Sequence, residues 1–155
     1  MSVVFRTAKT SDTEILVSFM KQLYQYDHSH FDEIGCRKAL PAILDRETYG
    51  KVWVIESAEA AIGYIVLTFG YSLEFHGRDA FIDELFIIEG HRKQGIGKKA
   101  IDLAIKTCRD MGIEALHLEV EHNNTNAQSV YRKLGFTDHS RYLMTKWTSS
   151  EPKTE

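Results

Sequence analysis

The chain has 155 residues, of which 43% are hydrophobic and only two are proline, so it is long enough for one domain with a substantial buried core. Its formal net charge of −3 argues against a binder of duplex nucleic acid, because neutralising phosphates requires a basic face. It has no run of about 18 apolar residues and no N-terminal apolar signal core, which predicts a cytoplasmic protein that does not bind a membrane.

The first part of the chain predicts a strand, two helices and a hairpin. Residues 3–6 have the composition of a short strand. Ser11 followed by Glu14 is a capping-box pattern, and the apolar residues after it share one helical face, which predicts a helix there. A second helix over residues 35–44 is weaker, because Pro41 inside it favours a break. The expected strands of the hairpin are residues 51–57 and 62–69.

The middle of the chain predicts two strands connected by a helix. Residues 81–88 are large and apolar apart from two acids, which is typical of a strand covered on both faces. A helical apolar face extends over residues 96–111, and Gly112 suits a left-handed C-cap. Residues 115–120 alternate as a strand. Together these three segments predict a parallel βαβ unit with a right-handed crossover.

The last part of the chain predicts one more helix and a strand pair that closes the sheet. Residues 123–126 supply capping side chains for a helix that is expected to reach Leu134 and to end at Gly135. Closing strands are expected at residues 136–137 and 141–147. The polar residues after them are expected to be disordered. The sequence therefore predicts a single domain over residues 1–147 and a tail over residues 148–155.

The turn at residues 92–98 combines basic side chains with glycines between a strand and a helix. Glycines allow close approach of the backbone and the first helical N–H groups have no intrahelical partner, so the turn predicts an anion site. It is not a Walker P-loop, because Ile96 rather than lysine follows the spaced pair Gly90 and Gly95. Residues 95–100 match the dinucleotide pattern G-x-G-x-x-[GA], but six residues separate them from the strand, whereas that fingerprint begins at the strand end.

Two further patterns resemble the GNAT superfamily of N-acetyltransferases. Arg92, Gly95 and Gly97 match its Arg-x-x-Gly-x-Gly loop for the acyl-CoA pyrophosphate. The second signature, Asn-x-x-Ala-x-x-x-Tyr-x-x-x-Gly-Phe, extends from Asn124 to Phe136 at the expected distance from the first. The resemblance implies an α/β fold with a mixed, mostly antiparallel central sheet, flanked by helices, whose two parallel central strands splay apart. It also implies acetyl-CoA as co-substrate, pantetheine between the splayed strands, and no metal.

Cofactor contacts are expected from the end of the central strand, the glycine turn and the second signature. Loop N–H groups suit the pyrophosphate, with help from neighbouring basic side chains. Strand backbone at residues 86–88 is implied to bind pantetheine, and an exposed N–H where the strands diverge would stabilise the oxyanion. The expected contact residues are Phe86, Ile87, Ile88, Arg92, Lys93, Gln94, Gly95, Ile96, Gly97, Lys98, Asn124 and Tyr131.

Three carboxylates are candidates for the base, because an alkyl amine with a pKa near 10.4 must lose a proton before it can attack. Asp83 and Glu84 are neighbours on one strand, so strict alternation would leave only one facing the substrate. Glu119 lies in a predicted apolar strand and resembles the corresponding position of the ribosomal-protein alanine acetyltransferases, where desolvation would raise its pKa. Glu84 or Asp83 acting through water is the preferred hypothesis, with Glu119 third. Tyr131, protonated at neutral pH, is the expected proton donor to the leaving thiolate.

The acceptor is expected to be a small or polycationic amine. Residues 23–27 and 69–72 resemble the diamine and polyamine acetyltransferases, although residues 31–44 and the C-terminus depart from that branch. Acids and tyrosines there would bind a cation by charge and cation–π contact. Two other classes stay open: a protein or peptide N-terminal acetyltransferase, and a non-enzymatic acyl-CoA- or dinucleotide-binding module. A homodimer is also left open. The expected substrate residues are Tyr24, Tyr26, Asp27, Tyr71 and Glu74.

Overall fold

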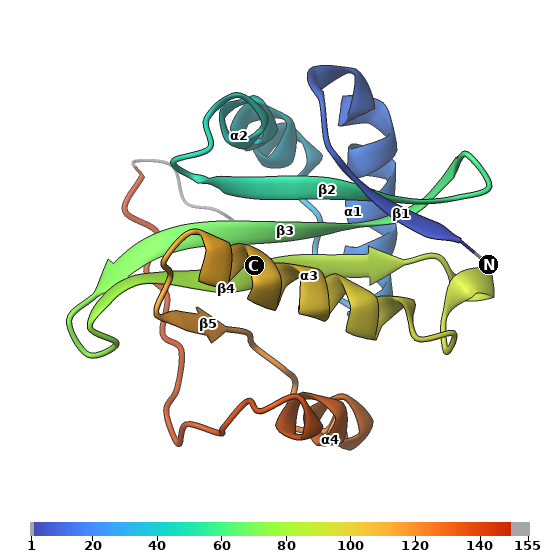
Figure 1. Ribbon diagram of the computed structural model, residues 1–155. Helices are drawn as coiled ribbons and strands as arrows, with labels where there is room; N and C mark the ends of the chain where they lie inside the picture. Colours follow the sequence, from blue (N-terminus) through green and yellow to red (C-terminus); the bar gives the residue numbers. More distant parts are fainter. Residues whose placement is uncertain (1, 150–155) are drawn as a thin grey trace. The chain divides into compact units, whose positions relative to one another are not determined.

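The computed structural model describes residues 2–149. Its contacts divide the chain into a first unit that ends at Glu119 and a second unit that begins at Val120 (Figure 1). Among the described residues, no helix has both the length and the apolar character needed to cross a bilayer.

The first unit is built on a five-stranded sheet with the strands in chain order, β1-β2-β3-β4-β5. The first three strand pairs are antiparallel and the β4–β5 pair is parallel. The expected mixed, mostly antiparallel sheet is therefore confirmed. The strands are β1 (Val3–Thr7), β2 (Gly50–Ser57), β3 (Ala60–Ser72), β4 (Gly77–Ile87) and β5 (Ala115–His117).

Helices cover both faces of this sheet. Helices α1 (Thr13–Tyr26) and α2 (Glu33–Asp45) lie on one face and α3 (Ile96–Asp110) lies on the other (Figure 1). Single turns of 3-10 helix precede α1 (η1, Thr10–Asp12) and follow β4 (η2, Glu89–His91). Helix α3 connects β4 to β5, so the predicted parallel βαβ unit is confirmed. The second unit contains α4 (Thr125–Lys133).

Alternation along the strands divides the core into two clusters. Val52 and Val54 of β2 pack in the cluster with α1 and α2, whereas Trp53 and Ile55 pack in the cluster with α3. Successive strand side chains point to opposite faces, so both clusters draw on the same strands. The helical faces predicted from residue spacing complete the clusters, with Leu16, Phe19 and Met20 from α1 and Ile96, Ala100, Ala104 and Cys108 from α3.

The start of α1 differs from the prediction. The capping box expected from Ser11 and Glu14 is wrong, because the turn η1 precedes α1 and Asp12 is the N-cap residue. The Asp12 carboxylate accepts a hydrogen bond from the Lys9 N–H at 2.7 Å and pairs with Arg6 at 2.9 Å. Asp12 therefore connects the end of β1 to the start of α1.

Pro41 does not break α2, which continues to Asp45. The break was expected because proline lacks an N–H and its ring crowds the preceding turn. Leu40 is buried in the cluster with α1, and Ile43 and Leu44 pack against that cluster. Tertiary packing of this apolar face outweighs the local cost of proline, as it outweighs propensity in most protein helices.

Two glycines end helices as predicted. Gly112 (φ 67°) follows α3 and Gly135 (φ 96°) follows α4, and both have left-handed backbone angles. After α3 the Ile113 N–H donates to the Cys108 carbonyl at 2.9 Å, which satisfies a terminal carbonyl of the helix. The chain can thereby turn directly into β5.

The strands predicted near the C-terminus are not formed. Strand β5 ends at His117, three residues before the predicted end. Residues 134–149 contain no helix or strand, so the closing strands expected at residues 136–137 and 141–147 are wrong. Apolar, alternating composition does not by itself make a strand, because the backbone groups need a partner. The tail predicted over residues 148–155 lies, from residue 150 onward, outside the described residues.

Candidate active site

Strand β4 has partners of very different length on its two edges. Strand β3 pairs with it from Gly77 to Ile87, whereas β5 pairs only with residues 79–81. Beyond Phe81, the described part of the chain provides no strand on that second edge. Unpaired strand N–H and C=O groups require other partners, and an extended ligand can supply them. We call this stretch, residues 82–87 on the side away from β3, the open edge of β4.

A β-bulge decides which backbone groups face the open edge. Ile82 lies opposite Leu67 and Glu84 lies opposite Val66, so Asp83 is an extra residue in β4. A bulge of this kind disrupts the regular alternation of the strand and can re-aim side chains. The prediction that Asp83 and Glu84 must face opposite sides is therefore wrong in its premise, since it assumed an unbroken strand.

Two backbone hydrogen bonds, one before the bulge and one after it, show that the bulge changes which edge of β4 the backbone groups face. The Arg78 carbonyl accepts from the Glu114 N–H, towards β5, and the Ile88 N–H donates to the Ile62 carbonyl of β3, each at 2.9 Å. Residues 78 and 88 would face the same edge in a regular strand. Because of the bulge they face opposite edges, and the N–H and C=O groups of Leu85 and Ile87 face the open edge.

The turn into α3 has the features of an anion site. Gly95 is the N-cap residue, with φ 79°, and its lack of a side chain leaves the first N–H groups of α3 without a side-chain cap. The first turn contains no acidic residue. A helix start with free N–H groups favours a bound anion. The predicted loop thus has the expected backbone, and its residue Lys93 also has a positive φ, 61°.

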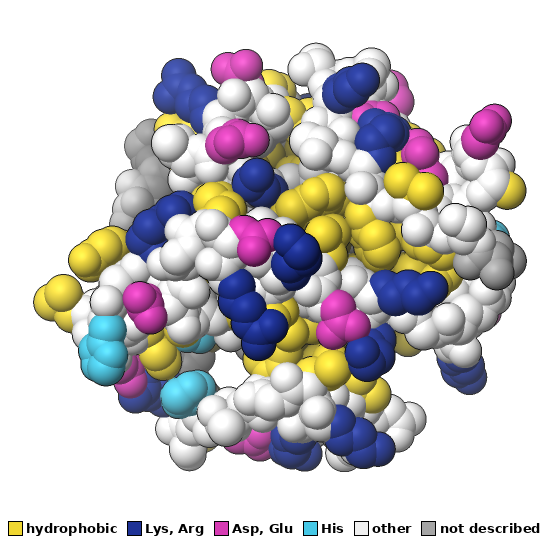
Figure 2. All heavy atoms as spheres, viewed as in Figure 1, with side chains coloured by type: hydrophobic (Ala, Val, Ile, Leu, Met, Phe, Trp, Pro, Cys, Tyr) yellow, Lys and Arg dark blue, Asp and Glu magenta, His cyan; other side chains and the backbone are white. Residues whose placement is uncertain are grey.

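The side chains of this turn point elsewhere. Lys98 pairs with Asp102 at 2.7 Å, and Gln94 donates to the Gly90 carbonyl at 3.2 Å. Over α3 as a whole, basic and acidic side chains are interspersed rather than gathered into a basic face (Figure 2). The anion site therefore depends on backbone groups more than on local net charge.

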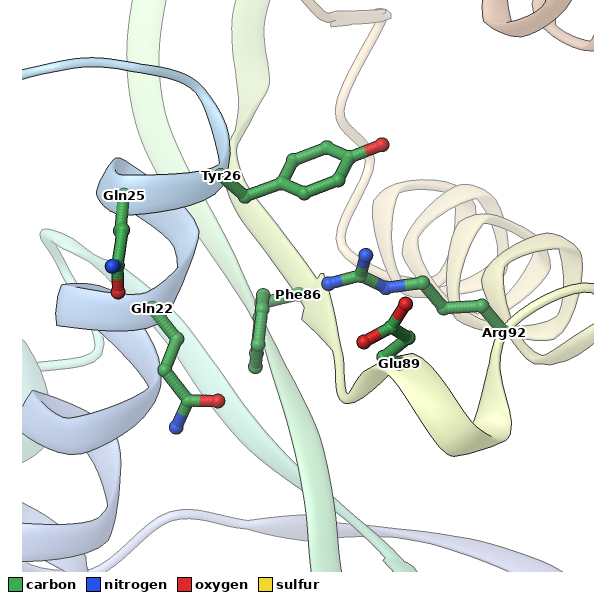
Figure 3. Close-up of a pocket in the computed structure, with 6 residues that line it drawn as sticks. All are labelled: Gln22, Gln25, Tyr26, Phe86, Glu89 and Arg92. Carbon is green, nitrogen blue, oxygen red and sulfur yellow. The ribbon is translucent and has the colours of Figure 1, made fainter.

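Arg92 lies at the open edge of β4 and does not point along the start of α3. Its Nε donates to the Ile87 carbonyl at 2.7 Å, and its guanidinium lies 4.5 Å from the Tyr26 ring centroid and 5.5 Å from that of Phe86. Figure 3 shows the guanidinium extending towards Phe86 below the Tyr26 ring. Arg92, Tyr26 and Phe86 line a pocket of about 280 Å³ together with Gln22, Gln25 and Glu89.

Glu84 is held between two tyrosines. The Tyr64 hydroxyl donates to Glu84 Oε1 at 3.3 Å, and Tyr24 is a second hydrogen-bonding partner. Burial, and next the charge of Asp83, raise the pKa of Glu84 to about 7, while the two hydroxyls act in the opposite direction and the charge of Asp27 adds to the rise. A carboxyl with a pKa close to neutral pH is suited to accept a proton and release it again.

The other two base candidates have different surroundings. Asp83 is exposed, although partial desolvation also raises the pKa of its carboxyl. Glu119 lies beyond the end of β5 and is exposed, so the apolar strand that was expected to desolvate it is not formed there. Of the three carboxylates, Glu84 has the surroundings that a base requires. Within residues 2–149, no group of three or more His, Cys, Asp or Glu side chains could hold a metal ion.

A family model described as "Acetyltransferase (GNAT) family" matches residues 15–136, which is most of the chain and includes both signatures. The chain belongs to the GNAT acetyltransferase family. The resemblance inferred from the two motifs is thereby confirmed, and so is the assignment to the acyltransferases.

Individual similar proteins span nearly the whole chain. A thialysine N-epsilon-acetyltransferase from Bos taurus is 28% identical over 145 residues, which are 88% of this chain and 85% of the relative. An integron cassette protein from the mobile metagenome of Cole Harbour Salt Marsh has a TM-score of 0.81 at 30% identity, covering 95% of this chain and 91% of that chain. A "predicted acetyltransferase" from Clostridium acetobutylicum, solved with acetyl-CoA, shares the fold with a TM-score of 0.79 at 18% identity, covering 94% and 96%.

The second GNAT signature lies in the second unit. The Asn124 side chain caps α4 by accepting from the Ala127 N–H at 3.2 Å, so its local role is structural. Tyr131 lies on α4, and its ring packs edge-on to Phe136 with centroids 6.0 Å apart. Burial raises the pKa of Tyr131. Its hydroxyl therefore keeps its proton at neutral pH, as a proton donor must.

The expected acceptor residues of this GNAT chain separate into two groups. Tyr24 hydrogen-bonds to Glu84, and the charge of Asp27 raises the pKa of Glu84. The Tyr26 ring contacts the Arg92 guanidinium. Tyr71 pairs with Arg78, six residues before Glu84, which corresponds to about 20 Å along the strand. Glu74 lies in the loop after β3, at the same end. The structure brings the first group to the base candidate and does not bring the second.

Sequence analysis missed two contributors to the site. Tyr64 was counted only as part of an expected strand, and the pocket residues Gln22, Gln25 and Glu89 were not singled out. One signal was present for Tyr64: it is the only residue with a hydroxyl between Ile62 and Leu67. A buried tyrosine hydroxyl usually has a hydrogen-bond partner, which identifies Tyr64 as a residue to examine.

Proposed function

We propose that this GNAT chain transfers the acetyl group of acetyl-CoA to a primary amine by direct attack in a ternary complex, and that the acceptor is small or polycationic. Family membership and the acetyl-CoA bound to a structural neighbour support the co-substrate. The name of the bovine relative, which specifies the epsilon-nitrogen of thialysine, supports an alkyl amine. The acids around Glu84 are consistent with a cationic acceptor.

The residues present fit acetyl-CoA as a substrate. The uncapped N–H groups from Gly95 to Lys98 suit the pyrophosphate, and the open edge of β4 suits the amides of pantetheine. The Ile87 carbonyl is one acceptor on that edge, and a pantetheine amide would take the place of its Arg92 contact. The packing of the described residues does not require glycine at position 97, since a Cβ there would meet only the Ile87 side chain, at 3.8 Å, and its absence leaves room for a ligand to approach the backbone.

Glu84 would begin the reaction by accepting a proton from the acceptor ammonium through a water molecule. The freed nitrogen lone pair forms a bond to the thioester carbonyl carbon, and the N–H of Leu85 or Ile87 stabilises the resulting oxyanion. The nitrogen gives its second proton to water as the adduct collapses and the carbon–sulfur bond breaks. The thiolate then takes a proton from Tyr131, whose role comes from the second signature.

Glu84 is the observation on which this proposal chiefly depends. A half-buried carboxyl with a pKa of about 7, on the strand that has the open edge, matches the requirement for a base that works at neutral pH. The same carboxyl in a binding module would have no comparable use.

The test is a panel of amines assayed for release of the CoA thiol from acetyl-CoA. Polyamines, thialysine, lysine, free amino acids and N-terminal peptides should be compared with wild-type protein and with Glu84→Gln. We expect dicationic amines to react fastest and the variant to lose most of its rate at low pH. Preference for N-terminal peptides would replace the proposed acceptor class. Binding of acetyl-CoA without turnover of any amine would favour the non-enzymatic module.

A further inference from the structure

Tyr64 is a buried residue whose position is fixed by aromatic packing. Its side chain is fully buried, and its ring lies parallel to that of Phe19 on α1, with an interplanar angle of 2° and centroids 6.2 Å apart. Phe86 packs against the same ring from β4, at 6.4 Å. Because the ring is fully buried and packed against these two rings, the hydroxyl is held beside Glu84.

The Tyr64 hydroxyl is a donor under all conditions in which Glu84 titrates. Burial, and next the charge of Glu84, raise the pKa of Tyr64 far above its ordinary value. The same two causes raise the pKa of Tyr24 on α1. Neither hydroxyl can lose its proton near neutral pH, so when Glu84 is ionised both can only donate to it.

We propose that Tyr64 is a positioning residue for acyl transfer, because its hydroxyl holds the Glu84 carboxylate in one orientation, with Tyr24 as a second donor. The proposal rests on the function proposed above, since Tyr64 acts only through Glu84. Tyr64 itself does not touch the acceptor. A base that is held in a productive orientation makes the reaction faster, because catalytic groups lose efficiency steeply when they are misplaced.

The remaining groups around Glu84 make such donors necessary. Asp83 on the same strand and Asp27 after α1 both raise the pKa of Glu84. The thiol of Cys36, on α2, lies near enough that its own pKa is raised by burial and then by the Glu84 charge. With acidic neighbours on two sides, the hydroxyls of Tyr64 and Tyr24 stabilise the ionised form that must accept the proton.

Tyr64→Phe tests the proposal, because it removes one oxygen and keeps the ring that packs against Phe19 and Phe86. Loss of a donor to the carboxylate should raise the apparent pKa in the kcat/KM profile by about half to one unit. The rate should therefore fall about three- to ten-fold on the acid limb and return towards wild type at high pH. Tyr49→Phe is the control, since Tyr49 is exposed and lies before β2.

Two further variants separate this proposal from the function on which it rests. In a Glu84→Gln background, Tyr64→Phe should change the pH profile no further. An equal loss of rate with and without Glu84 would overturn the positioning role. So would a wild-type profile for Tyr64→Phe when Glu84→Gln alone changes the profile. If Glu84→Gln alone leaves the profile unchanged, the base assignment fails first and the role of Tyr64 fails with it.

A titration of carboxyl carbons by NMR provides a readout that does not depend on turnover. Protein labelled at the glutamate side-chain carboxyl should show one resonance, absent from Glu84→Gln, that titrates near neutral pH. In Tyr64→Phe that resonance should titrate about half to one unit higher. An unchanged midpoint would show that the hydroxyl does not stabilise the carboxylate, and would overturn the proposal.

Discussion

Replacing Glu84 by glutamine should make the protein more stable at pH 8 and leave its stability nearly unchanged at pH 4. Burial, and next the charge of Asp83, raise the pKa of Glu84 from its ordinary 4.5 to about 7 in the folded chain. Between these two values the unfolded chain has released the proton and the folded chain still holds it. The free energy of unfolding therefore falls as the pH rises through this interval.

The size of the effect follows from the pKa difference. A rise from 4.5 to about 7 corresponds to about 3 kcal/mol, at 1.36 kcal/mol per unit. The stabilising contribution is complete below pH 4.5, is lost progressively above it, and is gone just above pH 7. Glutamine resembles the protonated carboxyl and does not titrate, so the Glu84→Gln variant should not lose this stability as the pH rises.

Urea-induced unfolding, followed by circular dichroism between pH 4 and pH 8, would measure the difference. The gap in unfolding free energy between Glu84→Gln and wild type should grow by about 3 kcal/mol over this range, in favour of the variant. Glu119→Gln is the matched control, because it makes the same chemical change at an exposed carboxylate. Wild-type and Glu84→Gln curves that run parallel would refute the reasoning, since Glu84 would then titrate alike in both states.

Three other predictions concern the co-substrate, the proton donor and the sheet. Acetyl-CoA should raise the melting temperature more than NAD or ATP, and Gly97→Pro should abolish that shift by removing an N–H donor in the first turn of α3 and straining the loop; equal shifts with NAD would contradict the acyl-CoA site. Tyr131→Phe should lower kcat about 100-fold with little change in acetyl-CoA affinity by calorimetry, and an unchanged kcat would leave Tyr131 a structural residue. Gly63→Ala should cost about 2–3 kcal/mol by urea unfolding, because its Cβ would lie 2.1 Å from the Phe86 carbonyl oxygen, whereas Gly90→Ala, which meets nothing within 4 Å, should be neutral.

Most of the fold could be predicted because it depends on periodic burial. The strands around Val52 and Ile65 and the helix that begins at Ile96 each have an apolar period that matches the face they bury. The hairpin, the parallel unit and the glycine at the end of α3 follow from the same local rules. The closing strands were wrong because strand formation also needs a paired partner, which no local pattern around Tyr142 reveals.

The candidate site could be predicted only in part, for a related reason. The glycine turn and Glu84 are recognisable in the sequence because their residue types and spacing indicate an anion site and a base. The contact between Tyr64 and Glu84 joins residues of two strands through the core, and a single sequence does not show that the two side chains meet. Arg92 was expected at the pyrophosphate, but its side chain is drawn to the Tyr26 ring and the Ile87 carbonyl, contacts that depend on where α1 packs.

The extra residue in β4 also has a consequence for how this chain tolerates insertion and deletion. Because Asp83 shifts the strand by one position, removing it would restore a single uninterrupted two-residue repeat from Gly77 to Ile87. If the part of the strand after the deletion kept its pairing, the side chains before the deletion would have to point to the opposite face, and Ala80 would leave the core. If the part before the deletion kept its pairing, Glu84 and Phe86 would have to point to the opposite face instead. The number of residues in β4 therefore cannot change even by one, and substitutions at Asp83 should be far better tolerated than deletion of this residue.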